Sequence, residues 1–318
     1  MKFILLGTSE FSLRCAEAVL DSGEEICALI SMPAYALPLN SADVSRFARA
    51  HGIPFHEIED VNVPKSVTLI RGYAAEYLLA SWPKLLGKEV LESPRFYCIG
   101  THPTELPFNR GRHPLHWLIA LGIQWTKLSF FRMDEGVDTG RVLLRVPFEI
   151  RGDDAIGDVV TKMNQAAYEG TKTLCAHLRE DPSYAGEEQN HSEANTWRKR
   201  TSHDVTLDLR MSASMIVRTV RSFALPYPCA NLLFESDLIK ISDAALVETD
   251  MTAKCLQRLE PGKIICIHGK TITVKADDGL VALAAKDALP KSILSAKYIH
   301  PPSRYLLRWP EAFAAYLA

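Results

Sequence analysis

A histidine and an aspartate near the middle of the chain are the two residues that could move protons together. His102 comes shortly after the apolar stretch Phe96–Ile99, and Asp138 lies in the turn Gly136–Gly140 between two stretches of strand-forming residues. If the fold brings them into contact, the carboxylate would orient the imidazole and raise its basicity, which suits general acid–base catalysis. Taken alone, a histidine before proline is more often structural, and an Asp-Thr-Gly sequence is commonly only a turn. The pair by itself therefore leaves a catalytic and a structural interpretation open.

The elements that would position this pair alternate between short apolar runs and amphipathic stretches. Strands are predicted at residues 3–6, 26–30, 77–80, 96–99, 127–133 and 142–150, and helices at 11–20, 43–51, 84–91, 114–121 and 155–178. This alternation predicts an α/β fold with parallel crossovers. His102 would then leave the carboxyl end of a parallel strand, which is where open α/β sheets bind ligands. Gly7 is not followed by the further glycines of a dinucleotide fingerprint, so the sequence does not favour NAD.

The sequence changes character after a polar segment at residues 181–196, which is predicted to be a linker or a surface loop. Beyond it, a helix is predicted at residues 212–220, and short strands are predicted at 231–234, 238–241, 263–267, 271–275 and 280–284. We therefore predict two domains, an α/β domain at residues 1–196 and a small, mostly β domain with a tail at residues 197–318. Exposed strand edges in the second domain would permit a homodimer.

Composition excludes several classes of protein. The chain has 318 residues, of which 47% are hydrophobic and 23% charged, and its formal net charge is -2. This near-balance argues against a non-specific nucleic-acid binder, which usually carries a basic excess. The seven cysteines form no C-x-x-C pair, which fits a reducing compartment and argues against a disulfide framework or a metal site. Because there is no secretory signal pattern and no apolar run near the ~20 residues of a membrane span, we expect a cytoplasmic protein.

Two motifs around the histidine and the aspartate, together with the flanking sequence, resemble a known family. Residues 101–112, THPTELPFNRGR, resemble the motif N-x-H-x-S-x-L-P-x-x-R-G of the 10-formyltetrahydrofolate-dependent formyltransferases, and residues 133–140, MDEGVDTG, resemble their M-D-x-G-x-D-T-G motif. The opening MKFILLGTSEF is similar to the first strand and turn of that family. Residues 198–230 resemble the second domain of the UDP-4-amino-arabinose formyltransferase. The resemblance covers nearly the whole chain and loses definition after about residue 285.

The resemblance implies a fold, a reaction and a site. The fold would be a Rossmann-like formyltransferase sheet followed by a smaller, mostly β, OB-like C-terminal domain. The reaction would transfer a formyl group from 10-formyltetrahydrofolate to a primary amine, with His102 and Asp138 as catalytic residues and no metal. The pterin of the folate would lie near two short stretches, whose residues are Ser81, Trp82 and Pro83 in the first and Met133, Asp134 and Asp138 in the second.

One position departs from the family pattern. The family usually has Asn two residues before the histidine, where its side chain donates a hydrogen bond to the developing oxyanion, and this sequence has Gly100 there. Losing one such donor typically costs about 2.7–4 kcal/mol of transition-state stabilisation. Protonated His102, Thr101 or a backbone N–H near Gly100 could replace it. Otherwise the protein would be a slow or inactive relative that only binds ligand.

Methionyl-tRNA and a nucleotide-linked amino sugar are the acceptors that the resemblance leaves open. The tRNA enzymes carry a basic insert near residue 33, whereas residues 33–42 of this chain, PAYALPLNSA, contain no charge. Sugar-modifying members often show R-G-R-x-P-x-x-W, which matches residues 110–117 here. We therefore predict an amino-sugar N-formyltransferase that makes a precursor of a surface glycan.

The predicted substrate contacts of that enzyme are Thr8, Ser9, Arg110 and Arg112. Trp117 also belongs to the sugar-type motif, but its helical spacing fits a core position as well. The remaining argument for RNA is a basic cluster in the second domain, comprising Arg198, Lys199, Arg200, Arg218 and Arg221, which would otherwise be a solvated face.

Overall fold

The computed structural model describes residues 1–38 and 41–306, and within it the chain divides into two compact units. The first unit comprises Met1–Pro114, Trp125–Glu149 and Val160–Trp197, and the second comprises Leu115–Gln124, Ile150–Val159 and the residues from Arg198 onward. The predicted boundary between residues 196 and 197 stays a prediction, as does the homodimer. The end of the predicted tail, at residues 307–318, lies outside the described residues.

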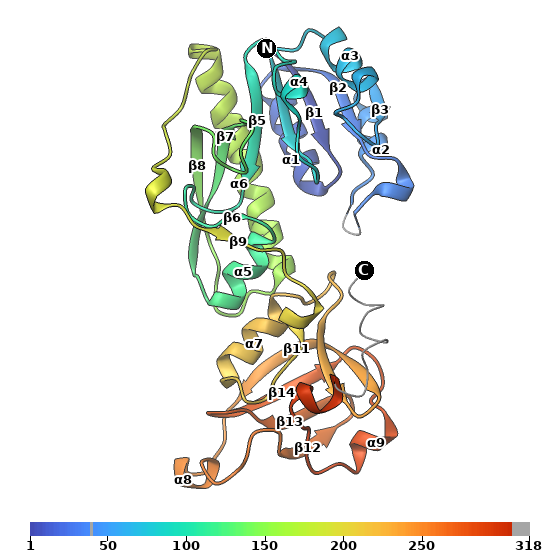
Figure 1. The fold of residues 1–318 in the computed structure, drawn as a ribbon, viewed down its shortest axis with the longest axis vertical. Helices are drawn as coiled ribbons and strands as arrows, with labels where there is room; N and C mark the ends of the chain where they lie inside the picture. The colour runs from blue at the N-terminus through green and yellow to red at the C-terminus, as the bar shows by residue number, and fades with distance from the viewer. Residues whose placement is uncertain (39–40, 307–318) are drawn as a thin grey trace. The chain divides into compact units, whose positions relative to one another are not determined.

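The first unit is built on a seven-stranded sheet (Figure 1). Its strands, in spatial order, are β3 (Phe55–Glu57), β2 (Glu25–Ser31), β1 (Lys2–Gly7), β4 (Tyr77–Ser81), β5 (Tyr97–His102), β7 (Trp125–Arg132) and β8 (Val142–Glu149). The first five run parallel, and β7 and β8 extend the sheet, with β7 antiparallel to β5 and β8 antiparallel to β7. The predicted Rossmann-like α/β fold is therefore confirmed.

Helices link the strands of the first unit. They are α1 (Glu10–Asp21), α2 (Val44–Ala50), α3 (Pro64–Gly72), α4 (Lys88–Leu91) and α6 (Ile156–Glu180), whose first residues group with the second unit. The helix predicted at 84–91 is shorter, because Gly87 is its N-cap and donates its N–H to the side chain of Asn62 at 2.6 Å. Sequence analysis missed both β3 and α3. The strand has only three residues, and α3 shows only a proline at its first turn as a start signal.

The strand order creates a reversal between β1 and β4. The chain proceeds outward from β1 to β2 and β3, and then returns to place β4 on the other side of β1. Such a switch point leaves a crevice at the carboxyl ends of the strands, where α/β proteins bind ligands. Gly7 pairs with Ser81, and Ala80 pairs with Gly100, so the ends of β1, β4 and β5 lie at the same level.

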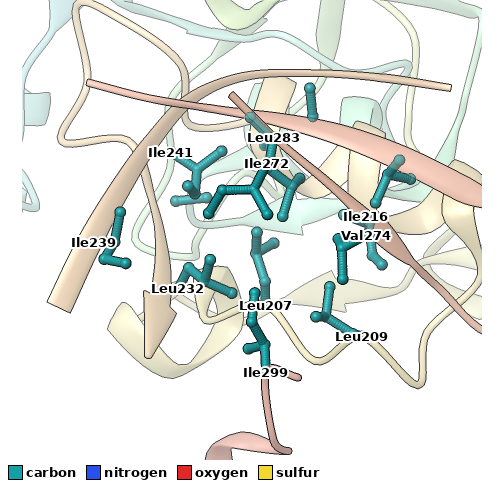
Figure 2. Close-up of a cluster of buried hydrophobic side chains, with 14 of the residues drawn as sticks. Leu207, Leu209, Ile216, Leu232, Ile239, Ile241, Ile272, Val274, Leu283 and Ile299 are labelled. Atoms are coloured by element: carbon teal, nitrogen blue, oxygen red, sulfur yellow. The ribbon is translucent and has the colours of Figure 1, made fainter. Parts of the chain in front are cut away.

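The second unit is a separate antiparallel sheet, in agreement with the predicted mostly β domain. Its strands, in spatial order, are β10 (Ala230–Phe234), β11 (Asp237–Val247), β14 (Leu280–Ala285), β13 (Thr271–Lys275) and β12 (Ile264–His268). Figure 2 shows its core, in which side chains of the strands meet Ile216 of α7 (Ala213–Arg221) and Leu207 and Leu209 of the preceding loop. Helices α5 (Pro114–Leu121), α8 (Ala253–Leu256), α9 (Lys291–Leu294) and α10 (Pro302–Leu306) complete the α-helices of the described chain.

The polar segment 181–196 is more structured than a linker. Glu187 exchanges two backbone hydrogen bonds with Val142, each 2.8 Å long. A 3-10 turn follows at His191–Glu193, and strand β9 (Thr196–Trp197) then pairs in parallel with β6 (Arg110–Gly111). Gln189 is 4% exposed. The segment has few apolar residues, and its backbone and side-chain amides, rather than a hydrophobic face, hold it to the first unit.

Neither a membrane helix nor a metal cluster is found in the part of the chain that the structure describes. No helix there is both long and apolar enough to cross a bilayer. No group of three or more histidine, cysteine, aspartate or glutamate residues there has a geometry that could hold a metal ion.

Candidate active site

His102 and Asp138 lie next to each other in the first unit. His102 is the last residue of β5, and Asp138 belongs to the turn that connects β7 to β8. Their atoms Nδ1 and Oδ2 are 3.4 Å apart, with 6% of the histidine side chain and 17% of the aspartate side chain exposed. The histidine is thus shielded while the carboxylate keeps some access to solvent, an arrangement that suits proton transfer to a bound molecule.

The second ring nitrogen of His102 has a backbone partner. Nε2 lies 2.8 Å from the carbonyl oxygen of Asn109, which can only accept, so Nε2 carries a proton in this contact. That carbonyl is held in place by the loop around Thr104, whose hydroxyl donates to the carbonyl of Phe108 at 2.8 Å. Nδ1 is therefore the nitrogen that can take up and release a proton, and it faces Asp138.

The turn that carries Asp138 has an unusual backbone geometry. Asp138 has a φ of 55°, in the left-handed region that Asp tolerates better than most residues. Its Oδ2 accepts a hydrogen bond of 2.9 Å from the N–H of Gly111. Gly111 has a φ of 103°, and a Cβ there would lie 2.4 Å from the carbonyl oxygen of Trp197. Only glycine therefore allows the Arg-Gly strand to approach β9 and donate to Asp138 at once.

Trp82 and Met133, two of the predicted pterin contacts, share one face of the sheet with His102. Alternation along β5 places Cys98, Gly100 and His102 on that face. Trp82 and Met133 pack against the hydrophobic cluster that contains Cys98. The indole N–H of Trp82 is buried and has no acceptor among the described residues, so it can donate to a ligand.

The other predicted pterin contacts are placed differently. Ser81 lines a cavity of about 10 Å³ together with residues of α1, and Pro83 is exposed. The carboxylate of Asp134 is exposed and accepts hydrogen bonds from the hydroxyl of Thr139 at 2.6 Å and the N–H of Gly136 at 3.0 Å. Asp134 therefore builds the turn, and no contact in the described part of the chain joins it to His102.

Burial excludes the thiol of Cys98 as a nucleophile. Cys98 is buried on the same face as His102, and burial raises the pKa of its thiol to about 12. Because the thiolate is the nucleophilic form, this cysteine stays inert near neutral pH. The histidine–aspartate pair is therefore the candidate for chemistry on this face.

Side chains at the end of β7 and directly after it fill the space beside Gly100. A Cβ at this position would lie 2.7 Å from Cζ of Phe131 and 2.9 Å from Cγ of Met133. Phe131 is the cross-strand partner of Gly100 and is buried. Thr101 points to the opposite face, where it lines the small cavity beside α1. Of the replacement donors that the sequence suggests, Thr101 is thus the one whose side chain faces away from His102.

Replacing Gly100 by Asn is expected to destabilise the protein without raising the rate of the formyl transfer that the resemblance implies. The new side chain must displace Phe131 and Met133, and overpacking of this kind costs about 1–3 kcal/mol of the free energy of unfolding. Urea unfolding and initial rates measure the two effects. The paired variant Gly100→Asn with Phe131→Leu removes the ring edge and should recover part of the stability. A single variant that keeps wild-type stability and gains rate would contradict the packing argument.

The predicted substrate contacts lie in two places. Thr8 and Ser9 follow β1 at the switch point, where Thr8 is buried and its carbonyl accepts a hydrogen bond of 2.9 Å from Ala42. Arg112 is exposed, and its guanidinium has no partner among the described residues. Arg110, in contrast, is 7% exposed and donates to Oε1 of Gln189 at 2.6 Å. Arg110 is thus connected to the Asp138 turn through Gln189.

Residues that support the pair were missed by sequence analysis. Gln189 donates through Nε2 to the carbonyls of Asp138, at 2.9 Å, and Gly140, at 2.6 Å. Asn195 forms two hydrogen bonds with Asn109, which in turn contacts His102. The one local signal that could have indicated these residues is the amide content of the segment 181–196. That content does not predict which distant backbone groups the amides contact.

Fold and site together define a class. The first unit is a Rossmann-like α/β sheet with a histidine–aspartate pair at the carboxyl end of β5, and a separate antiparallel β unit follows it. A family model described as formyl transferase matches residues 3–174, which is more than half of the chain, and a model of the formyl transferase C-terminal domain matches residues 199–300. The chain belongs to the formyl transferase family, and it is therefore an enzyme of formyl-group transfer.

Comparison with known proteins finds a relative in sequence and similar folds among solved structures. The chain is 29% identical over 291 residues to a methionyl-tRNA formyltransferase from Alkaliphilus oremlandii (strain OhILAs), covering 89% of this chain and 90% of that protein. Among solved structures, its fold is similar to an N-formyltransferase from Helicobacter canadensis in complex with folinic acid and dTDP-3-aminofucose. That match has a TM-score of 0.65 and 14% identity, and it covers 90% of this chain and all of the other.

A longer protein shares the same fold. HypX from Aquifex aeolicus, solved in complex with tetrahydrofolic acid, matches with a TM-score of 0.64 and 14% identity. The match covers 89% of this chain, but this chain spans only 43% of HypX. At this level of identity the likeness concerns the fold.

Proposed function

We propose that the protein transfers a formyl group from 10-formyltetrahydrofolate to the primary amine of a nucleotide-linked amino sugar, a precursor of a surface glycan, in the cytoplasm. The observation that carries the acceptor is the uncharged sequence of residues 33–42, whose last two residues contact the switch point. Ser41 forms a bridge with Ser9, and Ala42 donates to the carbonyl of Thr8, so these two residues lie beside the predicted substrate contacts. An RNA acceptor needs Lys or Arg at its phosphates, and this sequence has none.

The donor site fits a flat, polar ring system. Trp82 and Met133 offer apolar surface, and the indole N–H of Trp82 offers a buried donor without a partner among the described residues. A pterin has both the apolar face and the acceptor atoms that such a site requires. The folate complexes of the related Helicobacter canadensis enzyme and of HypX support this donor.

The chain's own residues would then manage the protons of the transfer. When bound, the folate supplies an activated formyl group: the acceptor amine forms a bond to the formyl carbon, and the bond from that carbon to the folate nitrogen breaks. The neutral amine must lose a proton, and His102 accepts it at Nδ1 while Nε2–H stays on the carbonyl of Asn109. The same proton is then returned to the folate nitrogen as it leaves, so that tetrahydrofolate departs neutral at that atom. The carboxylate of Asp138 stabilises the resulting imidazolium. Gly100 offers no side-chain donor, so the charge that develops on the formyl oxygen depends on protonated His102 or a backbone N–H.

The alternative acceptor is methionyl-tRNA, which the 29% identical relative favours. Its remaining support in the sequence was the basic cluster of the second unit. Arg198 pairs with Asp204, and its hydrogen bond lowers the pKa of that carboxyl to about 2. Arg218 donates to the carbonyl of Ala120 at 3.2 Å, and Arg221 donates to the carbonyl of Gly152.

Arg200 of the same cluster is buried. It donates to the carbonyl of His116 at 3.1 Å and to the hydroxyl of Ser222 at 2.8 Å. Burial lowers the pKa of its guanidinium to about 10, which still leaves it charged near neutral pH. The interpretation of the cluster as a solvated face is therefore wrong for Arg200, whereas Arg198 and Lys199 are exposed. Four of the five cations of the cluster already contact groups of the protein, which leaves fewer of them for phosphates and supports the sugar acceptor.

An acceptor panel tests the proposal. The protein is incubated with 10-formyltetrahydrofolate and either UDP- or dTDP-linked amino sugars or charged initiator tRNA, and mass spectrometry detects the gain of one formyl group. We expect a formylated sugar nucleotide and no formyl-methionyl-tRNA. Formylation of the tRNA alone would reverse the choice of acceptor. Folate binding without product for any acceptor would identify a relative that only binds ligand.

A further inference from the structure

The polar segment 181–196 carries side chains that support both members of the histidine–aspartate pair. We infer that Gln189 and Asn195, here called the amide clamp, are positioning residues of the formyl-transfer reaction. This inference rests on the proposed roles of His102 and Asp138. Each amide acts on the backbone that holds one of the two side chains, rather than on the reacting atoms.

Gln189 fixes the Asp138 side of the pair. It is 4% exposed, and its amide nitrogen donates to the carbonyls of Asp138 and Gly140, at 2.9 and 2.6 Å. Its Oε1 accepts from the guanidinium of Arg110 at 2.6 Å. Both polar ends of this buried amide are therefore satisfied by residues that frame the turn. Because Asp138 sits in the left-handed region, its carboxylate direction depends on such outside support.

Asn195 fixes the His102 side of the pair. Its Oδ1 accepts from the N–H of Asn109 at 2.8 Å, and its Nδ2 donates to Oδ1 of Asn109 at 2.9 Å. Asn109, whose φ is 61°, then presents its carbonyl to Nε2 of His102. This chain of contacts keeps the proton on Nε2 and leaves Nδ1 to exchange a proton in front of Asp138. Asn195 thus contributes to the choice of ring nitrogen through Asn109, together with the loop around Thr104.

Strand pairing explains why one segment can support both side chains. β9 pairs with β6 in the register Arg110 with Thr196 and Gly111 with Trp197. This pairing brings Asn195 beside Asn109, and the side chain of Arg110 in β6 reaches Gln189, while the N–H of Gly111 donates to Asp138. The predicted linker therefore serves as a support for the pair.

Two variants test the clamp. Gln189→Glu keeps the shape and an acceptor for Arg110, but it places an oxygen against the carbonyls of Asp138 and Gly140. Asn195→Ala removes both bonds to Asn109. We expect kcat to fall by about 10- to 100-fold in each, because small displacements of reacting groups have effects of this size. KM for the folate should change less than about threefold, since uniform binding is untouched.

Matched controls separate positioning from general damage. Gln165→Glu makes the same chemical change on the exposed face of α6, where Gln165 contacts Glu169. Asn190→Ala removes an exposed amide of the same segment that contacts Ser192. Both controls should keep wild-type kcat. Thermal unfolding of all four variants reports any loss of stability.

A spectroscopic measurement tests the clamp without any acceptor. The imidazole ¹⁵N shifts of His102, assigned by their loss in His102→Asn, should show a proton on Nε2 in the wild type and a mixture of tautomers in Asn195→Ala. Unchanged shifts in Asn195→Ala, or unchanged kcat in Gln189→Glu with an active wild type, would overturn the clamp. An inactive wild type with the expected shifts would instead refute the proposed function and leave the clamp supported.

Discussion

Replacing His102 by Asn is expected to lower the rate of formyl transfer by about 100- to 10,000-fold, the usual contribution of general acid–base catalysis. His102 is 5% exposed and lies between the carbonyl of Asn109 and the carboxylate of Asp138. An amide can fill part of that space, but it cannot take up and release a proton near neutral pH. Single-turnover rates with saturating donor and acceptor measure the loss.

Donor binding distinguishes this effect from a collapsed site. The folate contacts that we propose, Trp82 and Met133, are separate side chains, so calorimetry with 5-formyltetrahydrofolate should give nearly the wild-type affinity. His51→Asn is the matched control, since His51 is exposed at the end of α2 and contacts the carbonyl of Phe47. A His102→Asn enzyme that turns over at close to the normal rate would refute the role of the imidazole.

Replacing Asp138 by Asn is expected to cause a loss of similar size, about 100- to 10,000-fold, because it removes the negative charge that faces Nδ1 of His102. Asn is tolerated in the left-handed region that Asp138 occupies, and its side-chain oxygen can still accept from the N–H of Gly111. The turn should therefore stay in place while its charge is lost, and thermal unfolding should remain close to that of the wild type.

The matched control for Asp138→Asn lies in the same turn. Glu135 is exposed, and Glu135→Gln removes one negative charge from the turn without touching His102. Its rate should equal that of the wild type across the neutral pH range. Equal losses in both variants would mean that the net charge of the turn, rather than the position of the Asp138 carboxylate, supports the reaction.

Elements with strong local patterns are predictable from the amino-acid sequence alone. The apolar runs at residues 3–6 and 77–80 correspond to β1 and β4, and the long amphipathic pattern at 155–178 corresponds to α6. The burial of such elements follows the spacing of their own apolar residues, so the local sequence carries the signal. The short strand β3 was missed and the one-turn helix α4 was predicted too long, because a few residues hold too little periodic information.

The sequence by itself determined the fold class, the family and the residues around which a site would form, because motif order and local periodicity are properties of the sequence alone. Only the tertiary structure decided which groups meet there. Gly111 lies 27 residues from Asp138, Gln189 lies 51 residues from it, and Asn195 lies 86 residues from Asn109. Hydrogen bonds over such separations depend on strand pairing and turn geometry, as does the filling of the space at Gly100 by Phe131. Strand pairing and turn geometry are not encoded in the spacing of neighbouring residues. The segment that is predicted to be a linker therefore becomes a support of the site only once the chain is folded.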